Sequence, residues 1–159
     1  MNKLVAAVVF CGAMIGAPVA HAQTVIGTFS VNLTLTSVCN LSAITPVDLA
    51  YTSFQGVIAN GTNGNFTMTC TNNLPYTFGL QAGSGAAVPP GTPTINVTDD
   101  AVNLAYTLGT TAVGGTGNGA AQNYRVTGTM AAGQGGTCNS ASCSNALATN
   151  RTHTLIVTY

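Results

Sequence analysis

The sequence predicts an all-β fold, and two observations lead to that prediction. Short stretches rich in β-branched and aromatic residues alternate between apolar and polar positions along much of the chain, as half-buried strands do. Between them lie clusters of Gly, Asn, Ser and Pro, which are typical of turns. No stretch of helical length carries the i, i+3, i+4 apolar spacing of an amphipathic helix. This combination favours one β-sandwich or barrel.

The most regular alternation comes first, at residues 25–36. Its apolar positions would share one face of a strand, and they are Val25, Gly27, Phe29, Val31, Leu33 and Leu35. Polar residues occupy most of the other face. A strand at this end of the chain can pair within its own sheet or with the sheet of a neighbouring molecule. The pattern leaves both possibilities open.

Six further strands are predicted downstream, at residues 47–52, 65–71, 76–81, 103–108, 123–130 and 153–159. Stretches rich in Gly, Asn and Pro at 60–64, 83–85, 89–91 and 114–119 are expected to be turns. In the last predicted strand Leu155, Val157 and Tyr159 alternate. We expect this strand to leave one edge uncovered, which is an aggregation hazard unless another strand pairs with it.

Residues 1–22 have the features of a secretory signal peptide. Lys3 supplies the positive start, an apolar stretch follows at 4–19, and Ala20-His21-Ala22 is a small-residue cleavage site. A membrane anchor is the alternative, but the apolar stretch is shorter than the ~20 residues that span a bilayer. We therefore expect one exported domain over residues 23–159, either secreted or carried through the periplasm to the cell surface.

Charged residues are scarce throughout the chain: Lys and Arg together number three, and Asp and Glu together number three. This composition argues against nucleic-acid binding, which needs clustered basic residues, and favours association over a free monomer. Catalysis is not expected, because His153 is the one histidine beyond residue 22 and no nucleophile-elbow motif is present. No cofactor and no small-molecule substrate are expected.

Four cysteines follow the predicted signal, and in an exported chain an even number indicates disulfides. Three pairings are possible, and we favour Cys39–Cys70 with Cys138–Cys143. The first pair would join two neighbouring strands at bridging distance, and the second would close a short polar loop. A zinc site is disfavoured because the spacing matches no zinc pattern.

Several stretches of the sequence follow one another in a characteristic order. They are the alternation at 25–35 leading into Cys39, the stretch 66–71 with Cys70, the strand at 76–80 followed by 82–85, the Leu104-x-Tyr106-x-Leu108 strand, the segments 126–128 and 132–134, and the closing strand 154–159. In this order they resemble the spore coat protein U domain family, which includes subunits of archaic, Csu-type chaperone–usher pili. The loop with Cys138 and Cys143 is an insertion relative to that family.

The resemblance implies an incomplete immunoglobulin-like β-sandwich, completed by donor-strand complementation. Residues 23–35 would be the donor-strand extension, with Val25, Phe29, Val31 and Leu33 as the inserted side chains and Gly27 as a notch. The implied acceptor groove and chaperone contact consist of Leu155, Val157 and Tyr159, and the Tyr159 carboxylate would anchor the chaperone. The implied partners are copies of this chain or sister pilins, a periplasmic chaperone and an outer-membrane usher.

Two classes of function follow. One is a shaft or adaptor subunit of a surface pilus, serving adhesion or biofilm formation; a donor-like strand on a single domain favours this over a tip adhesin. The alternative is a self-contained secreted coat or surface protein, which would pair residues 25–35 within its own fold. Such a protein could bind carbohydrate through its tyrosines, which are Tyr51, Tyr76, Tyr106 and Tyr124.

Overall fold

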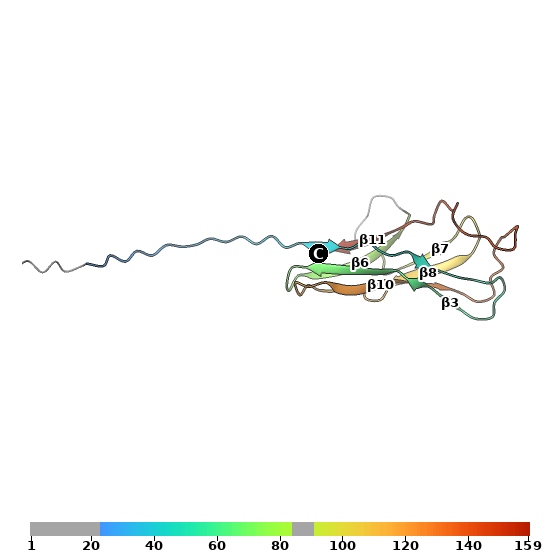
Figure 1. Ribbon diagram of the computed structural model, residues 1–159, viewed down its shortest axis with the longest axis horizontal. Helices are drawn as coiled ribbons and strands as arrows, with labels where there is room; N and C mark the ends of the chain where they lie inside the picture. Colours follow the sequence, from blue (N-terminus) through green and yellow to red (C-terminus); the bar gives the residue numbers. More distant parts are fainter. Residues whose placement is uncertain (1–22, 84–90) are drawn as a thin grey trace, which may run out of the picture. The chain divides into compact units, whose positions relative to one another are not determined.

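The computed structural model describes residues 23–83 and 91–159, and within them it contains eleven β-strands and no helix (Figure 1). The signal peptide predicted at residues 1–22 and most of the turns predicted at 83–85 and 89–91 lie outside the described residues. By internal contacts the chain divides into residues 1–34 and residues 35–159. No helix in the described part is long and apolar enough to cross a membrane.

Residues 35–159 form two antiparallel sheets and a small ribbon. The larger sheet has the order β1 (Cys39–Leu41), β5 (Asn65–Cys70), β10 (Gln122–Met130), β8 (Ala105–Thr110) and β7 (Thr94–Thr98), with β3 (Ala59–Asn60) also beside β10. The smaller sheet has the order β11 (His153–Thr158), β6 (Pro75–Ala82) and β9 (Gly114–Thr116). In the ribbon, β2 (Val47–Asp48) pairs with β4 (Thr62–Asn63).

The core lies between the two sheets. Alternation along each strand places buried side chains on the facing surfaces, and these are Phe66, Met68, Cys70, Tyr76, Phe78, Leu80, Leu108 and Val126. Phe66 of β5 meets Phe78 of β6 edge-to-face, with ring centroids 5.4 Å apart, a favourable aromatic geometry. The prediction of an all-β fold is confirmed, and the arrangement is that of an immunoglobulin-like β-sandwich.

Cys39 lies directly opposite Cys70 in the register of β1 and β5. The two are joined by a disulfide, and a second disulfide joins Cys138 to Cys143. These are the two pairings that the sequence favoured. The first disulfide fixes the start of β1 to a strand that is paired on both sides.

Four predicted strands match observed ones closely, namely β5, β6, β10 and β11. The strand predicted at 47–52 is wrong beyond Asp48. The strand predicted at 103–108 begins two residues late, because Asp99 accepts a hydrogen bond from the Asn103 backbone N–H and Asn103 adopts a positive φ of 52° in the resulting turn. The glycine-rich stretch at 114–119 is only partly a turn, since Gly114–Thr116 pairs with β6.

Residues 23–38 form no strand in this chain, despite their regular alternation. Their apolar side chains are exposed, with Val25 at 93%, Phe29 at 88% and Leu33 at 90% of full exposure. The first strand that belongs to the domain itself begins at Cys39. The segment 25–36 is therefore available to pair with something other than its own sheet.

Candidate functional site

A groove of about 660 Å³ lies among residues 44–51, the β8 and β10 strands of the larger sheet, and the start of β11. Its apolar walls come from both sheets and from the segment that follows β1. They include Val47, Leu49, Leu80, Leu104, Leu108, Val126, Met130 and Leu155. An apolar cleft of this size between two sheets has room for several side chains from another segment.

The strand at one side of this groove, β11, is the edge of its sheet and pairs with β6 alone among the described strands. On β6, the Phe78 backbone N–H donates to the Val113 carbonyl, and Leu80 exchanges two backbone bonds with Thr92. Both sets of bonds run away from β11. Because backbone groups alternate between the two sides of a strand, the intervening Gly79 directs its groups toward β11.

Gly79 stands opposite Ile156 in the register of this pair. Ile156 therefore bonds to β6, and its neighbours Leu155 and Val157 direct their N–H and C=O groups to the opposite side. No described strand lies there. β11 thus offers a row of unpaired backbone groups, which is a template for a further strand.

The same alternation decides where the side chains of β11 go. Leu155 and Val157 pack against the core between the sheets, and Leu155 also lines the groove. Ile156 is buried on the other face of the sheet. A strand added beside β11 would therefore place every second side chain over the apolar floor of the groove.

One end of the groove is polar. The Tyr106 hydroxyl of β8 and Nε2 of His153, the first residue of β11, lie 2.8 Å apart and join the two sheets by a hydrogen bond. Burial raises the pKa of the Tyr106 hydroxyl, and the charges of Asp99 and Asp100 raise it further. Burial also lowers the pKa of His153, so the histidine is neutral at pH 7.

Asp99 lines the same end and is only 2% exposed. Its Oδ1 accepts the backbone N–H groups of Ala101 at 2.9 Å and Val102 at 3.0 Å, which shapes the turn between β7 and β8. Its Oδ2 has no hydrogen-bond partner among the described residues, and neither does Nδ1 of His153. Two polar atoms at this end are thus buried and unsatisfied.

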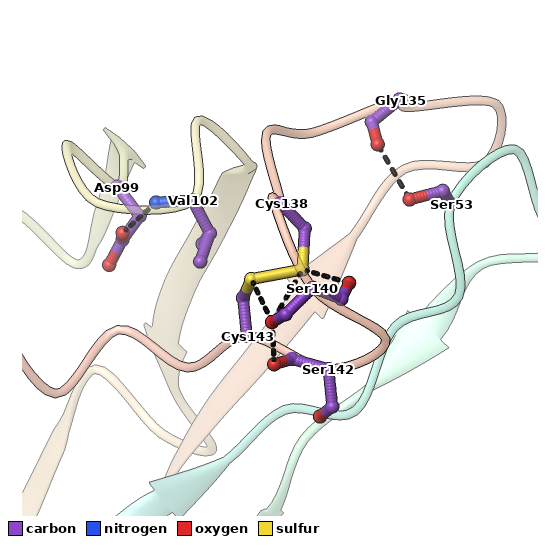
Figure 2. The surroundings of a disulfide bond; sticks show 8 residues. All are labelled: Ser53, Asp99, Val102, Gly135, Cys138, Ser140, Ser142 and Cys143. Carbon is purple, nitrogen blue, oxygen red and sulfur yellow. Dashed lines mark hydrogen bonds between the residues drawn. A yellow bond between two sulfur atoms is a disulfide. The ribbon is translucent and has the colours of Figure 1, made fainter.

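The loop closed by the Cys138–Cys143 disulfide borders this polar end, and Cys143, Ser144 and Asn145 line the groove. Figure 2 shows the Ser140 hydroxyl turned toward the two sulfur atoms, where it also donates to the Ser142 carbonyl at 2.7 Å. The disulfide and these local bonds hold the loop in shape. Cys143, which ends this loop, and the two residues after it therefore form a constrained part of the groove wall.

The predicted site residues fall into two groups. Leu155 lines the groove, Val157 packs on the core beside it, and Tyr159 is 58% exposed and does not line it. The predicted donor residues, from Val25 to Leu33, lie in the unpaired segment. The structure describes one chain and does not bring the two groups together.

Sequence reasoning missed the floor and the polar end of the groove. Leu108, Val126 and Met130 lie in predicted strands, and nothing in the sequence identified them with a groove. What makes them a groove floor is the lack of a strand over them, which no local pattern reports. Asp99 and Asp100 have the character of turn residues, and nothing in the sequence indicates that Asp99 is buried.

Among the described residues no three His, Cys, Asp or Glu side chains lie close enough to hold a metal ion. Tyr76 is buried and bonded to Tyr124 at 2.6 Å between hydroxyl oxygens, so these two rings belong to the core. The features of the site are apolar surface, unpaired backbone and two buried polar atoms. Such a site has the features that suit an extended segment of protein.

A family model described as the Spore Coat Protein U domain matches residues 25–152. No curated protein and no solved structure matches the chain. The matched range includes the unpaired N-terminal segment, both disulfides and every strand up to β10.

Proposed function

The chain belongs to the Spore Coat Protein U domain family, and from this premise we propose that it is a structural subunit of a chaperone–usher pilus, polymerising by donor-strand complementation. Residues 23–35 of one copy would form a strand beside β11 of another. We assign the chain to the shaft or to an adaptor position. The fibre would function in adhesion or biofilm formation.

One observation carries this proposal above the others. The free backbone edge of β11 borders an open apolar groove, in a chain whose alternating segment at 25–36 forms no strand. No described strand fills the groove. Residues 25–36 have the pattern of a strand but pair with no described sheet. Pairing the two between molecules satisfies the backbone groups and covers the apolar side chains at once.

The expected energy of this pairing is large. Fully burying a Val, Leu or Phe side chain contributes roughly 1.5–3 kcal/mol. The four proposed donor side chains would together contribute roughly 6–12 kcal/mol before the cost of ordering the segment is subtracted. Each copy would give its segment to one neighbour and receive another's. This head-to-tail contact does not close on itself and produces a filament.

The same reasoning supports the remaining assignments. An uncovered edge and groove would aggregate before assembly, so a periplasmic chaperone is expected to cover them and an outer-membrane usher to release them. The Tyr159 carboxylate is the proposed chaperone anchor. Residues 1–22 would direct export and be removed. The pilus would stand on the cell surface.

The self-contained coat protein is the weaker candidate. It requires residues 25–35 in the chain's own sheets, whereas they form no strand here. Its carbohydrate-binding form requires accessible tyrosine rings, whereas Tyr76 is 3% exposed.

The proposal is tested with a chain that lacks residues 23–33, to which a peptide of residues 23–35 is added while the thermal unfolding is followed. The deleted residues belong to no strand, and both disulfides lie outside them. We expect the peptide to raise the unfolding temperature strongly and to leave only slowly.

Two matched peptides serve as controls. One carries Phe29→Ser and Val31→Ser, and is expected to bind weakly because it loses apolar contact. The other carries Gly27→Val, which should weaken binding if Gly27 fits a notch. A truncated chain that is already stable and ignores the unaltered peptide would refute the pilin function and favour the self-contained alternative.

A further inference from the structure

The polar end of the groove contains a carboxylate oxygen that no described residue of the domain satisfies. Asp99 is 2% exposed, and only its Oδ1 has hydrogen-bond partners among the described residues. A buried carboxylate oxygen without a donor is costly. It is expected to gain one when the groove is filled.

A second unsatisfied atom lies at the same end. His153 uses Nε2 toward the Tyr106 hydroxyl, and its Nδ1 is buried with no partner in the described part of the chain. When the tyrosine donates to Nε2, Nδ1 carries the proton and is a free donor. Two residues that line this end of the groove then hold a buried acceptor, on Asp99, and a buried donor, on His153. A hydroxyl group, which both donates and accepts, suits this pair.

The N-terminal segment leaves the domain at the opposite end. Val38 is held there by Thr71, whose backbone N–H donates to the Val38 carbonyl and whose hydroxyl accepts the Val38 N–H. Next to Thr71, the Cys70 carbonyl accepts the Gly119 N–H, and the Leu74 carbonyl accepts the Gly117 N–H. In Figure 1 the C-terminus, where β11 ends, lies at the same end of the domain as the start of β1. His153, at the beginning of β11, is far from this exit.

These positions select an orientation for the incoming strand. If the incoming strand ran parallel to β11, the domain of the donor copy would lie at the end where the acceptor's own N-terminal segment leaves. The donor copy and the copy that receives the acceptor's segment would then crowd the same end of the acceptor. If it runs antiparallel, its domain lies beyond the polar end and the copies follow one another in line. The residues next to the incoming domain, 34–37, then reach the polar end.

We propose that the polar end of the groove is a hydrogen-bonding pocket that receives the Ser37 hydroxyl of the next copy, through Asp99 and His153. This inference rests on the proposed function and names the contact that fixes how far the strand enters. Ser37 lies on the same alternating face as the apolar donor residues. It is exposed and makes no hydrogen bond to the described part of its own chain.

The test uses the full chain after removal of its leader. Multimers formed by the purified chain are heated in detergent, and their rate of dissociation into monomers is measured for Ser37→Ala and for the matched control Thr36→Val on the opposite face. We expect dissociation to be roughly tenfold or more faster for Ser37→Ala, because a hydrogen bond to a charged group is lost. Thr36→Val is expected to change it little.

A variant on the acceptor side completes the test. Asp99→Asn keeps Oδ1 for the turn and replaces the charged acceptor with a donor, and the further effect of Ser37→Ala should shrink in that background. Monomer unfolding measured alongside shows whether Asp99→Asn acts through the fold, while Ser37→Ala removes no bond to the described part of its own chain. Multimers that dissociate equally fast with or without the Ser37 hydroxyl, or that respond to Thr36→Val instead, would overturn this inference.

The proposed function fails separately. If the unaltered chain forms no multimers, or if Phe29→Ala leaves them unchanged, the donor strand itself is wrong and the pocket loses its occupant. If Phe29→Ala weakens the multimers and Ser37→Ala does not, only the pocket is refuted.

Discussion

Residues 25–35 and the strand β11 carry the same kind of sequence. Each carries apolar side chains at every second position over several residues, and each is rich in Val, Leu and Thr. One forms a strand that contributes Leu155, Ile156 and Val157 to the packed domain, and the other forms no strand in this chain. The same alternation therefore produces different structures at the two ends of the molecule.

The difference lies in the partner. β11 has β6 beside it, paired over six positions from His153 to Thr158. The N-terminal segment has no such neighbour among the described strands. Alternation reports that a segment can form one wall of a sandwich, while the hydrogen bonds that make it a strand come from a second segment. In the proposed assembly, the free edge of β11 on another copy is such a second segment.

The sharpest test of this comparison replaces one phenylalanine in each region. Phe78→Ala removes a buried ring from β6 and should lower the free energy of unfolding by roughly 3–5 kcal/mol. Phe29→Ala should leave the unfolding of the monomer unchanged within about 0.5 kcal/mol, because its ring is exposed. Chemical denaturation of both variants, with multimer formation measured in parallel, checks this. A monomer destabilised by Phe29→Ala would show that the segment is already part of its own fold.

One disulfide lies at the root of the N-terminal segment and the other lies beside the groove. The two are expected to contribute differently to the free energy of unfolding. Cys39–Cys70 closes a loop of 31 residues and Cys138–Cys143 one of 5. Their loop-closure contributions are roughly 4 and roughly 2 kcal/mol. Paired Cys→Ala variants compared by thermal unfolding would measure both. An equal loss from the two would argue that the loop beside the groove supports the fold as much as the root of the N-terminal segment does.

The smallest expected effect concerns pH at the start of β11. Burial lowers the pKa of His153 below its ordinary value of 6.5, so the unfolded chain takes up a proton first as the pH falls. Stability from this group is therefore complete above pH 6.5 and declines below it. Unfolding measured between pH 7 and pH 5 should show a modest loss that is absent in His153→Gln. A dependence that survives this substitution would place its origin elsewhere.

Much of the sandwich was predictable because its central strands, β5, β6 and β10, bury one face and expose the other, so their alternation is regular. The short strand β7 was missed because Ile95 and Val97 are its only apolar residues. The strand β9 was missed because its glycines were read as a turn. A Cβ on Gly114 would collide with the Tyr76 backbone, so this glycine permits the close pairing of two strands.

The candidate site was predictable in part. The resemblance to the family implied Leu155 as a groove residue, and Leu155 lines the groove of this structure, whereas Asp99 and Tyr106 were not identified with the site. They lie about fifty residues before His153 in the sequence, and only the packing of the two sheets brings them to one end of the groove. Local patterns carry no information about which strand ends meet across a sandwich.

The disulfide at the root of the N-terminal segment has a mechanical consequence. A pull on residues 23–38 enters the domain at Cys39, the first residue of a three-residue edge strand that a modest force would peel away by breaking its hydrogen bonds in sequence. The bond to Cys70 passes that force directly into β5, which is held between β1 and β10. In the proposed filament, tension that reaches a domain through its N-terminal segment would therefore pass through a covalent bond into the interior of the larger sheet, and the first strand would stay closed under that load.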